Sequence, residues 1–149
     1  MQIIDDHNLI DNYRKLALEK NNVEHCAVAI GRKLPGQLSC YEIEDYCSIC
    51  ELGGRTTQNS VIIPWKISYA LIKVCIKNKN IPIIMHTHTS QSEEISFVSF
   101  SDIDQKFINS FYSSAKDCGF FSTCLFLVTD GNSVMACEKN QFNENYVLL

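Results

Sequence analysis

Two histidines and an aspartate are the clearest chemical feature of this chain. His86 and His88 are separated by one residue, and on a β-strand their side chains would point to the same face. Asp104 follows at the start of a predicted helix and can approach the same point. Two imidazoles and one carboxylate, with a fourth position open to water, are a usual ligand set for catalytic zinc. The pattern therefore predicts one zinc ion per chain at His86, His88 and Asp104.

The residues around this cluster predict the elements that position it. Residues 81–85 form a nearly continuous apolar run, which is typical of a buried strand, and the histidines would lie at its carboxyl end. After Ser101, apolar residues recur at helical spacing at Ile103, Phe107, Phe111 and Ala115. Ser101 is therefore the expected N-cap of an amphipathic helix.

Asp104 has a second interpretation. Ser101 and Asp104 have the spacing of a capping box, in which each side chain accepts a hydrogen bond from the other residue's backbone N–H. A purely structural cap and a metal ligand are both open, and one aspartate can serve both roles.

Together with an upstream glutamate, these residues resemble the JAMM motif of the JAB/MPN metalloprotease family. That motif reads His-x-His, a spacer and Ser-x-x-Asp, preceded by a glutamate on an earlier strand. Glu24, which opens the segment Glu-His-Cys-Ala-Val-Ala-Ile-Gly, matches that glutamate, and the resemblance covers roughly residues 20–130. It implies that His86, His88 and Asp104 bind zinc, that Glu24 is the general base, and that Ser101 stabilises the oxyanion.

The sequence departs from the family pattern after the second histidine. Thr89 stands where the family usually has proline, and the spacer of residues 89–100 is about five residues longer than usual. This spacer is interpreted either as a longer active-site loop or as a tolerated surface insertion. Ser99 and Asp102 also fit Ser-x-x-Asp, but the apolar residues that precede Ser101 and Asp104 favour the later pair.

The resemblance implies hydrolysis of an amide bond after the C-terminal Gly-Gly tail of a ubiquitin-like protein. The reaction would be deconjugation or precursor processing, and the expected partners are that protein, its conjugates and E1- or E2-like proteins. Processing of a sulfur-carrier protein's tail and a metal-free scaffold remain alternatives. A zinc nucleoside deaminase, whose fold is related, fits poorly because the Cys-x-x-Cys at Cys47 and Cys50 lacks a preceding proline and lies upstream of the histidines.

Composition limits the other possibilities. The chain has 149 residues and suits a single domain, 1–149, with a sizeable core. Its net charge of −4 and the lack of a basic stretch argue against nucleic acid as a partner. We expect a cytoplasmic protein, because residues 1–6 do not resemble a secretory signal and no apolar run approaches the roughly 20 residues of a membrane span.

Eight cysteines are many for this length. Four of them lie within apolar patterns and are predicted to be buried thiols: Cys26, Cys75, Cys124 and Cys137. A structural zinc at Cys47 and Cys50, with Cys40 as a third ligand, is a further hypothesis. Without a secretory signal, reduced thiols are the default.

The chain as a whole predicts an α/β fold. The resemblance implies the MPN/JAB, cytidine-deaminase-like form of it, a curved mixed sheet flanked by helices. Helices are expected over residues 6–20 and 64–79, besides the helix after Ser101. Strands and turns are expected as follows: strands 23–31, 38–52, 120–128 and 134–138, an edge strand 145–149, turns 33–37 and 129–132, and a mobile loop 53–57.

Overall fold

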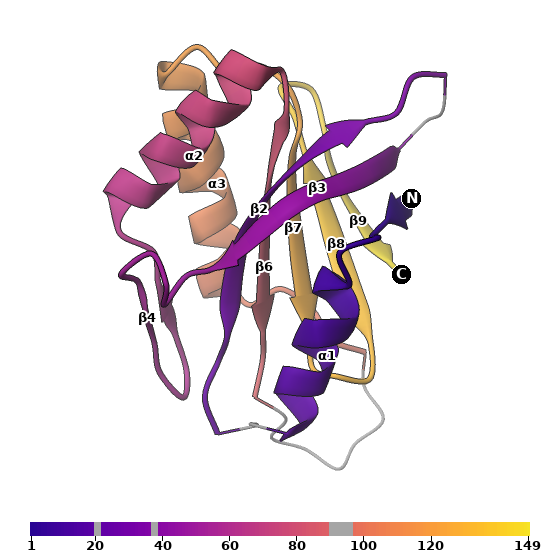
Figure 1. The fold of residues 1–149 in the computed structure, drawn as a ribbon, viewed down its shortest axis with the longest axis vertical. Helices are drawn as coiled ribbons and strands as arrows, with labels where there is room; N and C mark the ends of the chain where they lie inside the picture. Colours follow the sequence, from indigo (N-terminus) through magenta and orange to yellow (C-terminus); the bar gives the residue numbers. More distant parts are fainter. Residues whose placement is uncertain (20–21, 37–38, 90–96) are drawn as a thin grey trace.

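One curled mixed sheet of seven strands forms the centre of the protein, in the order β1-β3-β2-β6-β7-β8-β9 (Figure 1). The computed structural model describes residues 1–19, 22–36, 39–89 and 97–149. The strands of this sheet are β1 Gln2–Ile4, β2 Cys26–Lys33, β3 Cys40–Ser48, β6 Ile81–Thr87, β7 Cys124–Thr129, β8 Val134–Lys139 and β9 Glu144–Leu148. The described helices are α1 Leu9–Glu19, α2 Trp65–Asn78 and α3 Asp102–Asp117.

Helices cover both faces of this sheet. Helix α1 packs on one face, where Leu9 and Tyr13 join a core that includes Ile83 and Met85 of β6. Helices α2 and α3 cover the other face, and their core includes Ile84 of β6 (Figure 1). Alternate residues of β6 therefore belong to different cores, as the two-residue period of a strand requires. The expected α/β class with helices on both faces is confirmed.

Strand β6 is the middle strand of the sheet. It pairs antiparallel with β2 and parallel with β7, and six of its seven residues, all but His86, are buried. Burial on both faces explains its continuous apolar sequence. A parallel pair needs a crossover, and α3 lies in the connection from β6 to β7. The sheet therefore places the start of α3 after the carboxyl end of β6.

Most of the expected elements are present, with shifted ends. The hairpin β7–β8 forms around residues 130–133, and β9 pairs with β8 as an edge strand. Pro64 is the N-cap of α2 instead of its first residue. The strand expected from residue 120 begins at Cys124, and β3 ends at Ser48, where turns follow. The expected end of the first helix at residue 20, the end of the turn at 37 and the start of the strand at 38 lie outside the described residues.

The expectation of a mobile loop at residues 53–57 is wrong. Strand β4, Arg55–Thr56, pairs antiparallel with β5, Val61–Ile62, to form a separate two-stranded sheet. Each strand has only two residues, so the alternation of polar and apolar residues that identifies a strand cannot appear in the sequence. Strand β1, with three residues, is also too short to show this alternation and was not expected. It pairs parallel with β3 at one edge of the main sheet.

Two apolar side chains on the helices are exposed and do not pack in the core. In α2, Val74 is exposed and Ile72 is buried. In α3, the side chain of Ile103, in the first turn, is 69% exposed, whereas Ile108, Phe111 and Ala115 are buried.

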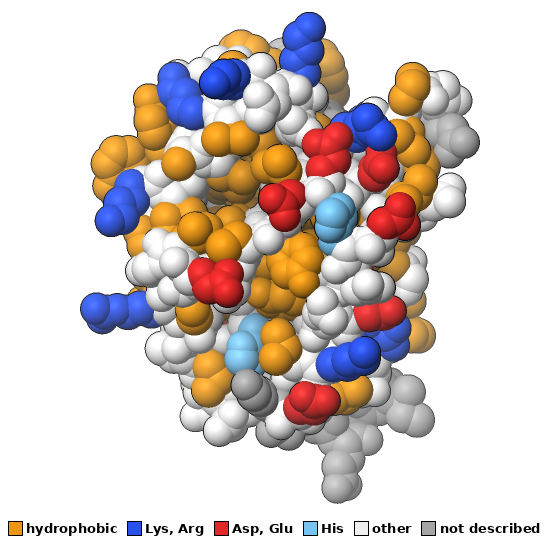
Figure 2. Space-filling model, in the orientation of Figure 1, with side chains coloured by type: hydrophobic (Ala, Val, Ile, Leu, Met, Phe, Trp, Pro, Cys, Tyr) orange, Lys and Arg blue, Asp and Glu red, His pale blue; other side chains and the backbone are white. Residues whose placement is uncertain are grey.

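Hydrophobic side chains gather on the face shown in Figure 2, between α2 and strands β2 and β3. This apolar groove is lined by residues of all three elements, among them Ile30, Tyr46 and Leu71. None of the helices in the described residues is both long and apolar enough to cross a membrane.

Candidate metal centre

His86 and His88 lie at the carboxyl end of the central strand. His86 is in β6. His88 follows the strand, and the backbone N–H of His88 donates to the carbonyl of Thr129 at 2.8 Å. Thr87, between the two histidines, is buried and points to the opposite face, where its hydroxyl accepts a hydrogen bond from the backbone N–H of His25 at 2.8 Å. The two imidazoles therefore share one face, as their spacing predicts.

Asp104 comes from the first turn of α3. Ser101 is the N-cap and has the extended backbone that this position requires. The backbone N–H of Asp104 donates to Oγ of Ser101 at 3.2 Å, and the backbone N–H of Ser101 donates to Oδ2 of Asp104 at 2.7 Å. The capping box is present, and the same carboxylate also faces the two histidines. The two roles of Asp104 that the sequence left open are thus compatible.

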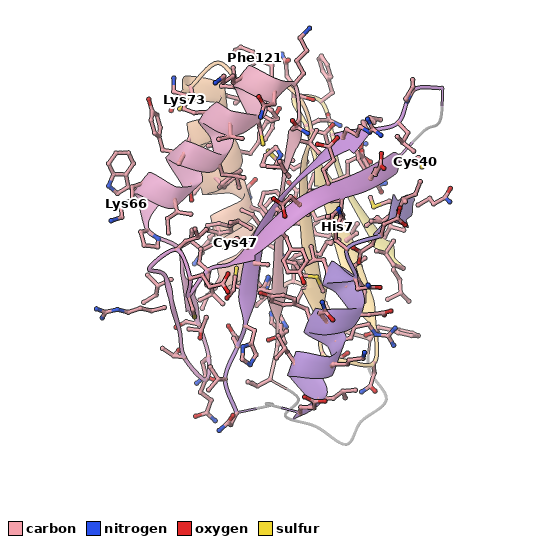
Figure 3. All side chains as sticks on the ribbon, in the orientation of Figure 1. His7, Cys40, Cys47, Lys66, Lys73 and Phe121 are labelled. Atoms are coloured by element: carbon pink, nitrogen blue, oxygen red, sulfur yellow. The ribbon has the colours of Figure 1, made fainter. Side chains whose placement is uncertain are left out.

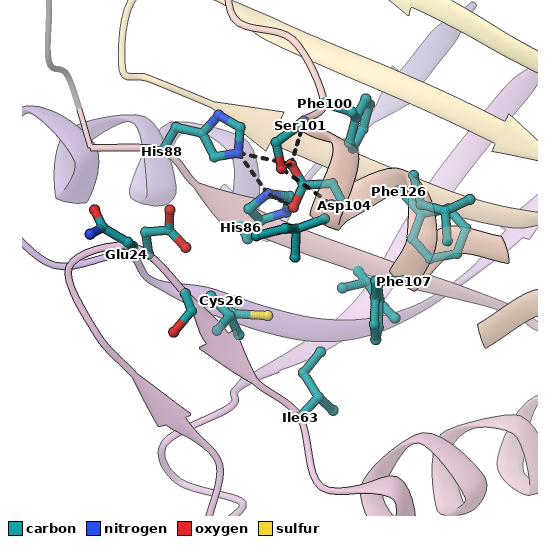
Figure 4. Close-up of a pocket in the computed structure, with 16 residues that line it drawn as sticks. Glu24, Cys26, Ile63, His86, His88, Phe100, Ser101, Asp104, Phe107 and Phe126 are labelled. Atoms are coloured by element: carbon teal, nitrogen blue, oxygen red, sulfur yellow. Dashed lines mark hydrogen bonds and ion pairs between the residues drawn. The ribbon is translucent and has the colours of Figure 1, made fainter. Parts of the chain in front are cut away.

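Three donor atoms converge at this point (Figure 4). Nε2 of His86 and Nε2 of His88 are 3.2 Å apart, and they lie 3.1 Å and 3.0 Å from Oδ1 and Oδ2 of Asp104. In a tetrahedral zinc site with bonds of about 2.0–2.1 Å, neighbouring ligand atoms are roughly 3.3 Å apart. The side chain of His86 is 13% exposed, that of His88 23% and that of Asp104 17%. This group could hold a metal ion.

The charges of the group are strongly coupled. Burial alone would raise the pKa of Asp104, but hydrogen bonds from His86 and His88 hold that pKa well below its ordinary value. Burial alone would lower the pKa of His88, but the hydrogen bond and the charge of Asp104 raise it. Asp104 is therefore ionised throughout the neutral range, which is the form that binds a cation.

Glu24 lies in the same cavity as these three residues (Figure 4). It was expected inside a strand, but it precedes β2 by two residues, and its backbone N–H donates to the carbonyl of Thr57 at 2.8 Å. Cys26 pairs with His86 across β2 and β6, so the same register continued by two residues brings Glu24 opposite His88. Burial raises the pKa of Glu24, against the lowering effect of the two histidines. A carboxylate with a raised pKa beside a cation site suits proton transfer.

The cavity has a volume of about 180 Å³. Its polar end carries Glu24, the two histidines, Ser101 and Asp104. Cys26 and Phe107 also line it, and neither was predicted to do so. Their spacing from the predicted site residues could have indicated both. In the expected strand 23–31, Cys26 follows Glu24 by two residues and shares its face. In the helix, Phe107 follows Asp104 by three residues and lies beside it.

The alternative pair Ser99 and Asp102 does not reach the histidines. Asp102 is the first residue of α3 and is exposed, and the group of possible ligands found in the described residues contains Asp104 instead. Most of the long spacer, residues 90–96, lies outside the described residues. Thr89, at its start, donates its hydroxyl to the carbonyl of Gln58 at 3.4 Å.

Within the described residues, the cysteines belong to no group of three or more possible metal ligands. Cys40 and Cys47 lie at opposite ends of β3 (Figure 3), about 23 Å apart at roughly 3.3 Å per residue. Cys40 as a third ligand beside Cys47 is therefore wrong. All eight cysteines are free thiols, and the four predicted to be buried are buried. Burial raises the pKa of Cys75 to about 12, so that thiol stays protonated at neutral pH.

No protein-family model matches the chain, and no curated protein matches it significantly. The likeness to JAB/MPN metalloproteases therefore rests on the five residues described above and their arrangement.

Proposed function

We propose that this protein is a zinc-dependent isopeptidase or peptidase that cleaves after the C-terminal tail of a ubiquitin-like protein. The observation that carries the proposal is the convergence of two imidazole nitrogens and a carboxylate within 3.0–3.2 Å of one another. A second carboxylate, that of Glu24, lines the same cavity. Three ligands and a nearby acidic residue are the usual composition of a hydrolytic zinc site.

The donor set suits zinc. Imidazole nitrogens and a carboxylate are ligands that zinc accepts in catalytic sites, and three protein ligands leave a position for water. Zinc bound by His86, His88 and Asp104 would lower the pKa of a water molecule to about 7. The polar end of the cavity would then hold a nucleophile at neutral pH.

Glu24 would act as the general base and then as the general acid. Its partial burial raises its pKa above the usual range, so its carboxylate takes up a proton more readily than a solvated glutamate does. It would accept the proton of the attacking water and deliver that proton to the leaving amine. General acid–base catalysis of this kind contributes about 10²–10⁴-fold in rate.

Ser101 would stabilise the oxyanion. Its hydroxyl donates to Oδ2 of Asp104 at 2.8 Å, so it lies at the ligand cluster, and its side chain is exposed to the cavity. Turning that O–H toward the substrate's carbonyl oxygen would place a donor where negative charge develops. Loss of one such donor typically costs roughly 100-fold or more in rate.

An extended C-terminal tail fits the surroundings of the cavity. Strand β5 belongs to a two-stranded sheet, and its Val61 lines the cavity. Within the described residues β5 pairs with β4 alone, so its other edge can pair with an added strand. Glycines at the end of the tail would let its backbone approach the ligand cluster closely.

The test combines zinc content with cleavage of a ubiquitin-like protein fused through its Gly-Gly tail to a reporter. The wild type should bind about one zinc per chain and release the reporter at the glycine. His88→Ala should lose both properties, and Asp102→Ala, in the same region, should keep both. A wild type that binds no zinc after reconstitution would overturn the proposal in favour of a metal-free scaffold.

A further inference from the structure

The cavity beside the ligand cluster continues into an apolar end. Away from Glu24 and the histidines, Ile63 and Phe107 face each other across it, and Phe126 lies beyond (Figure 4). Ile84 of β6 and Ile108 of α3 also line this end, and both are buried. The walls thus come from the sheet, from α3 and from the segment between β5 and α2.

The size of the cavity limits what it can hold. A cavity of roughly 150 Å³ lined by leucine, isoleucine and phenylalanine is large enough to bind benzene. The cavity here, polar and apolar ends together, has a volume of about 180 Å³. It therefore has room for one leucine- or phenylalanine-sized side chain beside the ligand cluster.

The aromatic rings behind this end give it a defined shape. The ring centroids of Phe107 and Phe126 are 6.3 Å apart in an edge-to-face arrangement. Phe111 also packs edge to face on Phe126, with ring centroids 5.7 Å apart. Edge-to-face pairs of this kind add stability beyond the area that they bury. We therefore expect the wall to keep its form when the cavity is filled.

We propose that this apolar end is a specificity pocket for a bulky apolar side chain on the amine side of the scissile amide. The inference rests on the proposed function, because the glycine that ends such a tail has no side chain to fill a pocket beside the scissile bond. The residue after the cleaved bond must then supply it. The substrate class is accordingly a linear precursor in which an apolar residue such as leucine or phenylalanine follows the glycine.

Two isoleucines provide a matched pair of variants. Ile63 lines the apolar end and is half-buried, whereas Ile76, in α2, is 38% exposed and does not line the cavity. Ile63→Phe adds volume inside the pocket, and Ile76→Phe adds the same volume at the surface. Val61→Phe, from β5, is a second filling variant in case Ile63→Phe does not fold.

The first experiment measures binding without catalysis. Toluene is added to the metal-free and the zinc-loaded protein, and its binding is followed by ligand-observed NMR. We expect the wild type and Ile76→Phe to bind it in both states and the filling variant to lose at least tenfold in affinity. Absence of binding to the wild type, or equal binding by a filling variant, would overturn the pocket whatever the protein's activity.

The second experiment measures selectivity on tail fusions that differ only in the residue after the glycine. We expect kcat/KM to be at least about tenfold higher for leucine than for glycine at that position, since even one methylene in an apolar pocket gives roughly 10–200-fold discrimination. In Ile63→Phe the ratio should approach one, and in Ile76→Phe it should stay as in the wild type. Preference for an isopeptide-linked lysine over the leucine extension would overturn the linear precursor as the substrate. Toluene binding without cleavage of any fusion would retain the apolar pocket and reject the hydrolase.

Discussion

At the scale of single residues, the proposed chemistry depends on the different surroundings of two carboxylates. Asp104 accepts hydrogen bonds from both histidines, which hold its pKa well below the ordinary value despite burial. Glu24 lies in the same cavity, but burial raises its pKa. A pair of carboxylates whose pKa values are moved apart fits a division of labour, with one as a ligand and the other as a proton carrier.

We expect Glu24→Gln to bind zinc as the wild type does and to cleave about 10²–10⁴-fold more slowly, because glutamine keeps the shape but cannot carry the proton. The measurement is elemental analysis together with the rate on a tail fusion. Glu19→Gln, at the exposed end of α1, should behave as the wild type. A Glu24→Gln variant with undiminished rate would exclude Glu24 as the base.

At the scale of elements, the start of α3 combines a structural role with the proposed chemical one. Ser101 caps the helix through its Oγ, and the same hydroxyl donates to Asp104 within the ligand cluster. The cap fixes the first turn of α3, and that turn positions the carboxylate against the end of β6. The two roles can be separated, because glycine is nearly as good an N-cap as serine and alanine is not.

We therefore expect Ser101→Ala to lose about 0.5–2 kcal/mol of unfolding free energy and Ser101→Gly only a few tenths of a kcal/mol. Both variants should lose roughly 100-fold in rate, since neither has the hydroxyl. Denaturant unfolding and the rate on a tail fusion measure the two effects. Full activity in Ser101→Gly would show that the serine acts only as a cap.

The edge strand β9 allows a prediction for pH dependence. Glu144 pairs with Lys139 across β8 and β9, and hydrogen bonds from Lys139 and Tyr146 lower the pKa of its carboxyl below the ordinary 4.5. A folded-state pKa below the unfolded one adds stability above the unfolded pKa, and that stability is lost as the pH falls through the folded one. Glu144→Gln should therefore lower the unfolding free energy at neutral pH and have little effect at strongly acid pH. Unfolding in urea from pH 7 to pH 3 measures the difference, and a difference that does not change with pH would contradict the assignment.

At the scale of the whole molecule, the candidate metal centre joins parts of the chain that are distant in sequence. His86 and His88 come from the central strand, Asp104 from a helix on one face, and Glu24 from the segment before β2. A metal held there would tie α3 to the middle of the sheet. Its binding energy would then add to the stability of the fold, because the unfolded chain has no preformed site.

Zinc should raise the melting temperature of the protein. A ligand at 100 times its Kd stabilises the folded state by about 2.7 kcal/mol. For a domain of this size that corresponds to roughly 5–10 °C. Thermal unfolding with zinc, and again after a chelator is added, measures the shift. His88→Ala should show no shift, and an equal shift in that variant would place the stabilising zinc elsewhere.

The sequence by itself determined the local parts of this protein. Alternation along a strand indicated that His86 and His88 share a face, and the spacing of Ser101 and Asp104 indicated a helix cap; both are present. The continuous apolar run before the histidines predicted the buried strand β6. These features depend on neighbours along the chain, whose relation follows from the fixed geometry of strands and helices.

The tertiary structure decided whatever depends on residues that are far apart in sequence. It brought Asp104 and not Asp102 to the histidines, and it placed Glu24 in the same cavity as them. It also formed the apolar end of the cavity from the sheet, α3 and Ile63. None of this follows from local periodicity, because register and packing are set by the joint burial of many side chains across the sheet.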